Sequence, residues 1–142
     1  MKEMVYNYNL KKQEILVDGI YMGYHFLIVS YGTHPCAYVE VPKTHPLYKS
    51  DYSEYEFDFD VHCGLTWGDT LSYAKGWYFG WDYRHIGDYD AFAEKMAIEY
   101  PSLKYERELN GKKWTVEEIF EDVKKCIMKL KDLEDLRYIE VK

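Results

Sequence analysis

The sequence predicts an α+β fold, an antiparallel β-sheet with one face covered by a long C-terminal helix. Two observations support this class. Segments with β-strand character lie between residues 13 and 81, and the strongest helical pattern follows them. Runs of strands followed by helices are typical of α+β proteins. The 142 residues suffice for one core, so we expect a single domain over 1–142.

Three runs rich in β-branched and aromatic residues, each bounded by turn formers, predict the first strands. They are Gln13 to Val17 before Asp18-Gly19, Tyr24 to Tyr31 before Gly32, and Cys36 to Val41 before Pro42. Proline ends the third run because it cannot donate to a sheet ladder. The segment from Pro42 to Asp51 lacks apolar periodicity and is predicted to be a loop.

Two further strands are predicted in the middle of the chain. Apolar and acidic residues alternate from Tyr55 to Val61, which indicates a strand with one buried and one solvated face. Trp77 to Trp81 is apolar on both faces and is predicted to be a central strand. Within it, Gly80 marks a bulge or a close backbone approach.

Two helices are predicted after the strands. Thr115 and Glu118 have the spacing of a capping box, and an apolar stripe at three- and four-residue steps follows. The stripe consists of Val116, Ile119, Phe120, Val123, Cys126, Ile127, Leu130 and Leu133. A shorter helix is predicted from Asp90 to Tyr100, ended by Pro101. Its inward-facing residues are predicted to be Phe92, Met96 and Ala97.

The charge distribution disfavours nucleic-acid binding. The net charge is −7, and residues 51–100 hold 11 acidic residues against three basic ones. Phosphate neutralisation needs clustered lysine and arginine, and the chain has only three arginines, so we expect no duplex nucleic-acid partner. The aromatic content of 18% is compatible with a homodimer.

The cellular context also follows from composition. No apolar run is long enough for a membrane span, and the first ten residues lack the apolar core of a signal peptide. We therefore expect a cytoplasmic protein without a membrane partner. Three cysteines at wide spacings, with no C-x-x-C pair, are predicted to be reduced thiols.

Histidines and aspartates come directly after two of the predicted strands. His62 follows the segment Tyr55 to Val61, and Asp82 and His85 follow Trp77 to Trp81. If these strands pair, the imidazoles meet at one edge of the sheet. Histidine acts as general acid or base near neutral pH, and a carboxylate orients it. His62 and His85, with Asp82 or Asp88 as the orienting group, would form an acid–base pair.

Other interpretations of the same residues stay open. The Asp-x-x-His-x-x-Asp spacing of residues 82–88 is also typical of a turn network without chemistry. A divalent metal is a rival use of the groups, since histidine and aspartate suit zinc, manganese or iron. Cys63 as nucleophile is less favoured, because its neighbour His62 would point to the opposite face of a strand.

Aromatic and acidic side chains each have two interpretations. Trp67 is the best candidate for stacking on a ligand base, whereas Trp77 and Trp81 are predicted to lie in the core. An acidic row is predicted to be a solvated sheet face, or alternatively a mimic of nucleic-acid phosphate that blocks a DNA-binding enzyme. The row consists of Glu54, Glu56, Asp58 and Asp60.

Four fragments occur in order between residues 24 and 90. They hold His34, Cys36, Tyr38 and Val39, then His45 and Pro46, then Val61, His62, Gly64, Leu65 and Thr66, then Gly80, Asp82, His85, Gly87 and Asp88. They resemble the pattern Gly-His-x-Cys-Gly-Tyr-Val, His-Pro, Val-His-Gly-Gly-Leu-Thr and Gly-Phe-Asp-x-x-His-x-Gly-Asp of a family of small, largely uncharacterised bacteriophage and bacterial proteins. The chain departs from it at Ala37, Cys63 and Trp81, and by an extra residue before His34. A side chain at position 63 implies a different turn after His62.

The resemblance implies one site, without a reaction attached. Its catalytic residues would be His45, His62, Asp82, His85 and Asp88. By analogy with small phage proteins that act against host defence, the ligand would be a nucleotide immune signal in the host cytosol. Its binding residues would be Trp67, Thr66, Arg84, Lys43 and Tyr48. We therefore expect hydrolysis of a cyclic or dinucleotide; the alternatives are a non-catalytic sponge and the acidic DNA mimic.

Overall fold

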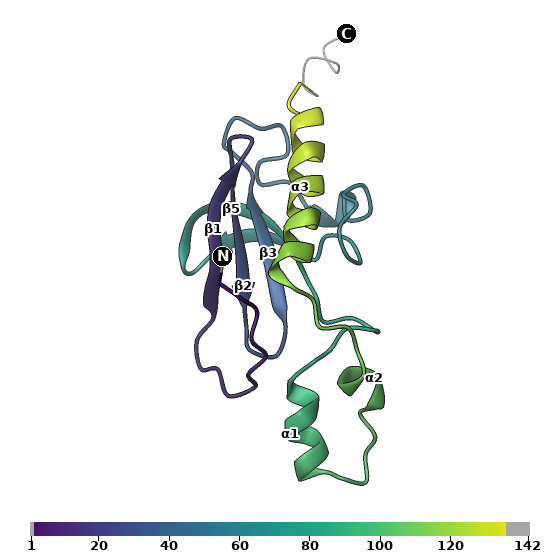
Figure 1. Cartoon of the computed structure of the whole chain (residues 1–142). Helices are drawn as coiled ribbons and strands as arrows, with labels where there is room; N and C mark the ends of the chain where they lie inside the picture. The colour runs from purple at the N-terminus through teal and green to yellow at the C-terminus, as the bar shows by residue number, and fades with distance from the viewer. Residues whose placement is uncertain (1, 136–142) are drawn as a thin grey trace.

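The computed structural model describes residues 2–135, and these form an antiparallel sheet whose last strand is followed by α-helices (Figure 1). The strands are β1 Glu14–Tyr21, β2 Tyr24–Ser30, β3 Pro35–Glu40, β4 Trp67–Leu71 and β5 Ala74–Asp82. The helices are η1 Tyr52–Glu54, α1 Phe92–Glu99, α2 Glu106–Leu109 and α3 Val116–Asp132. The strand order is β1-β2-β3-β5-β4, with every neighbouring pair antiparallel. The α+β class is confirmed.

The first hairpin turns later than predicted. Strand β1 continues through Asp18-Gly19, where Gly19 pairs with Phe26 and lies under its ring. The chain turns instead at Met22 and Gly23, which both have positive φ, of 48° and 85°. Two such residues form the tight turn that matches the twist of a hairpin. The prediction of a turn at Asp18-Gly19 was therefore wrong.

The segment from Tyr55 to Val61 is not a strand. It coils through successive turns, in which the Asp58 N–H donates to the Tyr55 carbonyl and the Val61 N–H to the Phe59 carbonyl. Phe59 and Val61 reach the core from this coil, whereas Phe57 is 79% exposed. The acidic residues of the segment therefore do not line one face of a strand. Strand β4, which lacks a clear alternation, takes the edge position beside β5.

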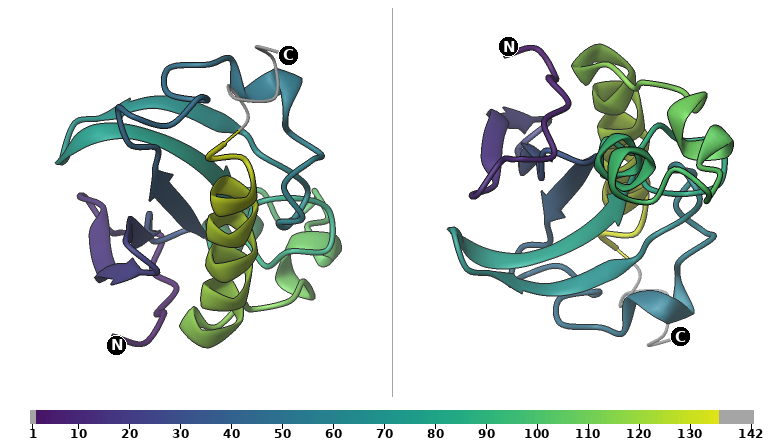
Figure 2. Two further views of the ribbon diagram at one scale, coloured as in Figure 1. Left: turned by 90° about the horizontal axis from the view of Figure 1, so that it is seen from above. Right: turned by 90° about the horizontal axis from the view of Figure 1, so that it is seen from below.

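The two faces of the sheet bury different sets of side chains. On one face, residues of β2, β3 and β5 share a core with α3 and with the coil of residues 42–66. This set includes Phe26, Ile28, Ala37, Val39, Phe79 and Trp81 from the strands, Ile119, Val123 and Ile127 from α3, and Leu47, Phe59 and Leu65 from the coil. Helix α3 contacts β1, β2 and β3, and the β4–β5 hairpin curves with the twist of the sheet (Figure 2).

The predicted close approach at Gly80 is made by Tyr38. A side chain at position 80 would collide with the Tyr38 ring, which belongs to the core on the second face of the sheet. That core also holds Leu27, Val29, Cys36 and Tyr78. Trp77 and Trp81 are buried in the first core, as predicted.

The helices differ in how they are held. The capping box of α3 is present, with Thr115 Oγ1 accepting from the Glu118 N–H. In α1, by contrast, only Ala93 is buried. Of the residues predicted to face inward, Met96 and Ala97 are half-buried, whereas Phe92 is 39% exposed, so the prediction is wrong for Phe92. Helices α1 and α2 lie apart from the sheet (Figure 1), on an excursion whose ends meet where Asp88 bridges Lys112. None of the described helices is both long enough and apolar enough to cross a membrane.

Candidate acid–base site

A tight turn after the coil brings His62 to the loop that follows β5. Cys63 and Gly64 both adopt positive φ, of 58° and 82°. Cys63 thus takes the left-handed conformation that glycine adopts more easily, so the expectation of a different turn at this position finds no support. A side chain on Gly64 would collide with the Glu56 carbonyl, which accepts from the Leu65 N–H.

A buried carboxylate, Asp88, joins the two histidines. Asp88 is 4% exposed. Its Oδ2 lies 2.7 Å from His62 Nε2 and accepts from the His85 backbone N–H at 2.9 Å. Its Oδ1 accepts from Trp114 Nε1–H at 2.8 Å. Three donors satisfy the carboxylate, which is the condition for keeping a charge in a buried position. Because a carboxylate only accepts, His62 donates from Nε2.

The ring of His62 is held by aromatic neighbours. It stacks parallel to Tyr83, with centroids 5.0 Å apart, and lies 4.7 Å from the Trp114 ring. Tyr83 donates to Asp122 Oδ2 at 2.6 Å, and the same oxygen accepts from the His62 backbone N–H. Burial and the Asp122 carboxylate raise the pKa of the Tyr83 hydroxyl, so it stays protonated and remains a donor. The orientation of His62 is therefore determined from several sides.

His85 forms a second pair with Asp82. His85 Nε2 lies 2.8 Å from Asp82 Oδ1, at a direction that does not make a hydrogen bond. Asp82 is also contacted by Thr66 Oγ1 at 3.5 Å and by the Arg84 N–H at 3.3 Å. The predicted groups His62, Asp82, His85 and Asp88 thus lie together, with Thr66 and Arg84 beside them.

The two imidazoles are in direct contact, and each leaves one nitrogen open. Their centroids are 5.6 Å apart and their planes meet at 73°. Among the described residues, the only buried side-chain polar atom without a hydrogen bond is His85 Nε2, so neither Nδ1 atom is buried. Neither Nδ1 has a partner on the described part of the chain. Both nitrogens are therefore accessible for proton exchange.

His45 lies elsewhere, and its assignment to the site is corrected. Its ring is buried, with Nε2 2.7 Å from the Leu130 carbonyl and Nδ1 accepting from the Leu47 N–H at 3.0 Å. Leu130 belongs to the last turn of α3, whereas the site contacts α3 at Asp122 in its first half. His45 therefore binds the C-terminal end of α3, and both its ring nitrogens make hydrogen bonds within the protein.

Three predicted ligand-binding residues make no contact, within residues 2–135, with the two histidine–carboxylate dyads, His62–Asp88 and His85–Asp82. Tyr48 packs against Trp77, with centroids 6.3 Å apart. Lys43 is exposed between Pro42 and Thr44, which line a cavity at the C-terminal end of α3. Trp67 is 40% exposed on the edge strand β4, opposite Gly80, and makes no ring contact with the described site residues.

Three contributors were not predicted from the sequence: Tyr83, Trp114 and Asp122. Tyr83 lies between Asp82 and Arg84, which were both predicted to belong to the site. It follows the core residue Trp81 by two positions, a spacing that places two side chains on the same face of a strand and could have indicated its burial. Trp114 directly precedes the cap of α3, and Asp122 lies on that helix. No local pattern distinguishes either from an ordinary surface residue.

The geometry gives little support to Cys63 as a nucleophile or to a bound metal ion. Cys63 Sγ lies 3.8 Å from His62 Nε2, but burial and the nearby Asp88 and Asp82 raise the pKa of the thiol, which disfavours the nucleophilic thiolate. Within residues 2–135, no group of three or more His, Cys, Asp or Glu side chains has an arrangement that could hold a metal ion. The three cysteines are free thiols.

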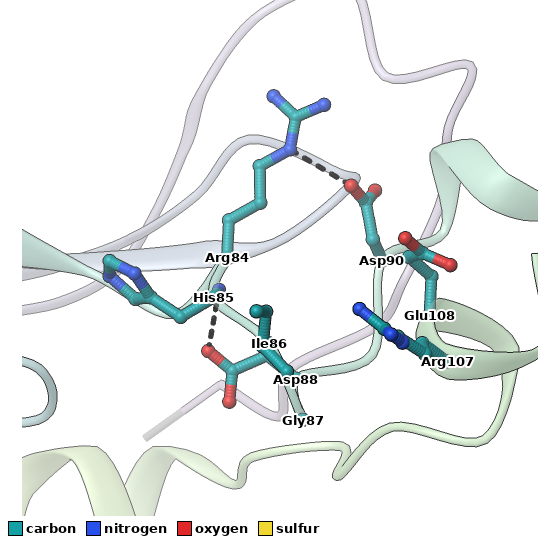
Figure 3. A pocket seen from close by; sticks show the side chains of 8 residues that line it. All are labelled: Arg84, His85, Ile86, Gly87, Asp88, Asp90, Arg107 and Glu108. Atoms are coloured by element: carbon teal, nitrogen blue, oxygen red, sulfur yellow. Dashed lines mark hydrogen bonds and ion pairs between the residues drawn. The ribbon is translucent and has the colours of Figure 1, made fainter.

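A cavity of about 290 Å³ adjoins the dyads. It is lined by Arg84, His85, Ile86, Gly87, Asp88, Asp90, Arg107 and Glu108 (Figure 3).

Comparison of the chain with known protein families, with curated proteins and with solved structures finds no match.

Proposed function

We propose that the chain hydrolyses a phosphoric ester bond of a small nucleotide, with His62 and His85 as the general acid and base. One observation carries the proposal: two histidines in ring contact, each beside its own carboxylate, both have an Nδ1 atom that is not buried. Such pairs of imidazoles suit reactions that need a proton removed and a proton supplied at one centre.

The chemistry follows from the protonation of the two rings. A neutral imidazole whose Nε2–H faces a carboxylate presents an unprotonated Nδ1, which takes a proton from the attacking water. The other ring, protonated at both nitrogens, gives its Nδ1 proton to the leaving oxygen as the P–O ester bond breaks. The water oxygen forms the new bond to phosphorus. Asp88 and Asp82 stabilise whichever ring is charged.

The substrate class rests on the resemblance and on nearby cations. Residues 24–90 resemble a phage and bacterial family to which no reaction is attached, and the nucleotide signal comes from an analogy with small phage proteins that act against host defence. The acidic surroundings oppose an anionic ligand, but Arg84 and Arg107 line the cavity beside His85 and Asp88 and offset part of that charge. The alternative of an acidic DNA mimic relied on a strand at residues 55–61, and this segment is a coil, so its acidic residues lack the regular spacing of a strand face.

The test is incubation of the purified protein with a panel of cyclic and dinucleotides, with and without EDTA, followed by chromatography before and after heat denaturation. Hydrolysis predicts a nucleotide that is lost and does not return on heating. A nucleotide that returns intact makes the protein a sponge and overturns the proposed hydrolysis; no loss of any nucleotide overturns the proposal as a whole.

A matched pair of variants localises the activity. His62→Ala should abolish hydrolysis by the folded protein. Because the variant also removes one donor from the buried Asp88 carboxylate, its melting temperature should fall, and activity is compared per folded molecule. His25→Ala is the control, since His25 is a histidine of β2 that contacts Asp18 and Tyr78 and lies outside the dyads. Equal loss in both variants would contradict the assignment of the site.

A further inference from the structure

We infer that the cavity between the loop of residues 84–90 and α2 binds a second phosphate group of the same substrate. This inference rests on the proposed function. It assigns the substrate to nucleotides that carry another phosphate apart from the ester that is cleaved.

The cavity gathers the arginines of an arginine-poor chain. Of three arginines in the sequence, Arg84 and Arg107 line this one space, although the segment 51–100 is strongly acidic. Figure 3 shows Arg107 extending from α2 toward the loop that carries Ile86 and Asp88. Guanidinium groups bind phosphate through paired N–H donors, which makes arginine suited to this ligand.

Arg84 is positioned by a buried carboxylate. Its Nε donates to Asp90 Oδ2 at 2.9 Å, and the other carboxylate oxygen of Asp90 accepts from the Phe92 N–H. Asp90 is itself 8% exposed. Because no further hydrogen bond or ion pair of the Arg84 side chain occurs on the described chain, its terminal amino groups stay available.

Arg107 has no partner of its own within residues 2–135. Neither a hydrogen bond nor an ion pair joins its guanidinium to a described residue. The helix that carries it is nevertheless fastened to the cavity, since the Asp90 and Gly111 N–H groups both donate to the Glu108 carbonyl. The Arg107 side chain is exposed, and an unpaired cation beside a positioned one favours an anionic ligand.

The cavity is lined by three carboxylates, Asp88, Asp90 and Glu108, against two guanidinium groups, but two of the carboxylates already have donors on the chain. Asp88 is satisfied by three donors, and Asp90 by Arg84 and the start of α1. Only Glu108 presents a carboxylate without a partner on the described chain. Glu108 therefore opposes an anion, and its removal should strengthen anion binding.

The cavity and the dyads share two residues, which connects the two binding positions. His85 and Asp88 line the cavity and also belong to the histidine–carboxylate pairs. In Figure 3 the His85 ring points away from Arg107. One ligand can thus have its reacting phosphate at the rings and a second phosphate near Arg107.

Pyrophosphate binding, measured by calorimetry on the full chain, tests the subsite without requiring turnover. Arg107→Ala should weaken binding by about tenfold or more, Arg107→Lys by less, and Glu108→Gln should strengthen it. Lys104→Ala is the control of equal charge change, because Lys104 is exposed and outside the cavity. Equal weakening by Lys104→Ala, no effect of Arg107→Ala, or tighter binding of malonate than of pyrophosphate would overturn the phosphate subsite.

Two further results separate this inference from the proposed function. With substrate, Arg107→Ala should raise KM for a nucleotide with two separated phosphates and leave a single-phosphate ester unaffected. Pyrophosphate binding that depends on Arg107, without hydrolysis of any nucleotide, would support the anion subsite and reject the hydrolase. The assignment of the subsite to a second phosphate of the substrate would then be rejected too. Hydrolysis that is insensitive to Arg107→Ala would reject the subsite alone.

Discussion

The imidazole rings of His62 and His85 meet edge to face, with centroids 5.6 Å apart. One ring comes from a tight turn after a coil, and the other from the loop after β5. Asp88 links them, since its Oδ2 faces His62 Nε2 and also accepts from the His85 backbone N–H. This arrangement holds two imidazoles at one place, and proton transfer by both rings is the central claim of the proposed mechanism.

Replacing Asp88 by Asn should lower hydrolysis by about a hundredfold or more, the scale on which acid–base groups contribute. The amide keeps the shape but loses the charge that stabilises a protonated ring. Steady-state rates of the variant, with thermal melting to confirm folding, check this. Trp114→Phe, which removes one donor to Asp88 and keeps a ring, should cost much less. Activity of Asp88→Asn within twofold of the parent would contradict the role.

His45→Ala should destabilise the fold by roughly 2–4 kcal/mol and leave catalysis by the folded protein intact. The variant leaves the Leu47 N–H without a partner and removes the packing of a buried ring, whereas the Leu130 carbonyl still accepts from the Leu133 N–H at 3.2 Å. A buried unpaired group costs about 1–3 kcal/mol, and the lost packing adds to it. Chemical denaturation measures the stability, and rates per folded molecule measure the activity. A variant that is stable but inactive would show that His45 takes part in catalysis after all.

Cys63→Ser should retain the proposed hydrolysis, and alkylation with iodoacetamide at neutral pH should not inhibit it. The raised pKa of the Cys63 thiol keeps it protonated, and an uncharged thiol is a weak nucleophile. The measurement is activity before and after alkylation, with mass spectrometry to report labelling. Complete inactivation of the serine variant would instead identify Cys63 as a nucleophile.

His34 should make the fold less stable in mild acid. Burial lowers the pKa of its ring, a shift that Arg84 and His85 reinforce and that Asp82 and Asp90 only partly oppose. The unfolded chain therefore takes up a proton at a higher pH than the folded chain, so stability present above pH ~6.5 is lost as the pH falls.

The comparison that isolates this effect is His34→Gln. Melting temperatures of both proteins at pH 7.5 and 5.5 should show a larger drop for the parent than for the variant. Equal drops, or a parent that becomes more stable in acid, would show that the His34 pKa is not lowered by folding.

Strong local patterns in the sequence correspond to observed elements. β2, β3 and β5 follow from runs of β-branched and aromatic residues, and α3 follows from its capping box and apolar stripe. These patterns work because each element buries most of one stripe or face. Strand β4 was missed because it is a short, exposed edge strand, and α2 because it is a single turn with no buried residue.

The proximity of the site residues was predicted partly for the wrong reason. The alternation of Tyr55 to Val61 comes from Phe59 and Val61, which enter the core from a coil instead of a strand. His62 nevertheless reaches His85, because the left-handed turn at Cys63 redirects the chain. His45 was misassigned since its ring bonds to a distant helix end, a contact that local sequence does not show.

The most direct test of the central claim is a double-mutant cycle of His62→Ala and His85→Ala on kcat/KM for the nucleotide that the panel identifies. If the two rings act on one reacting group, each single variant should lose about a hundredfold or more, and the double variant should be little worse than the poorer single variant. Losses that multiply fully would show that the rings act independently. Unchanged kcat/KM in either single variant would contradict the claim outright.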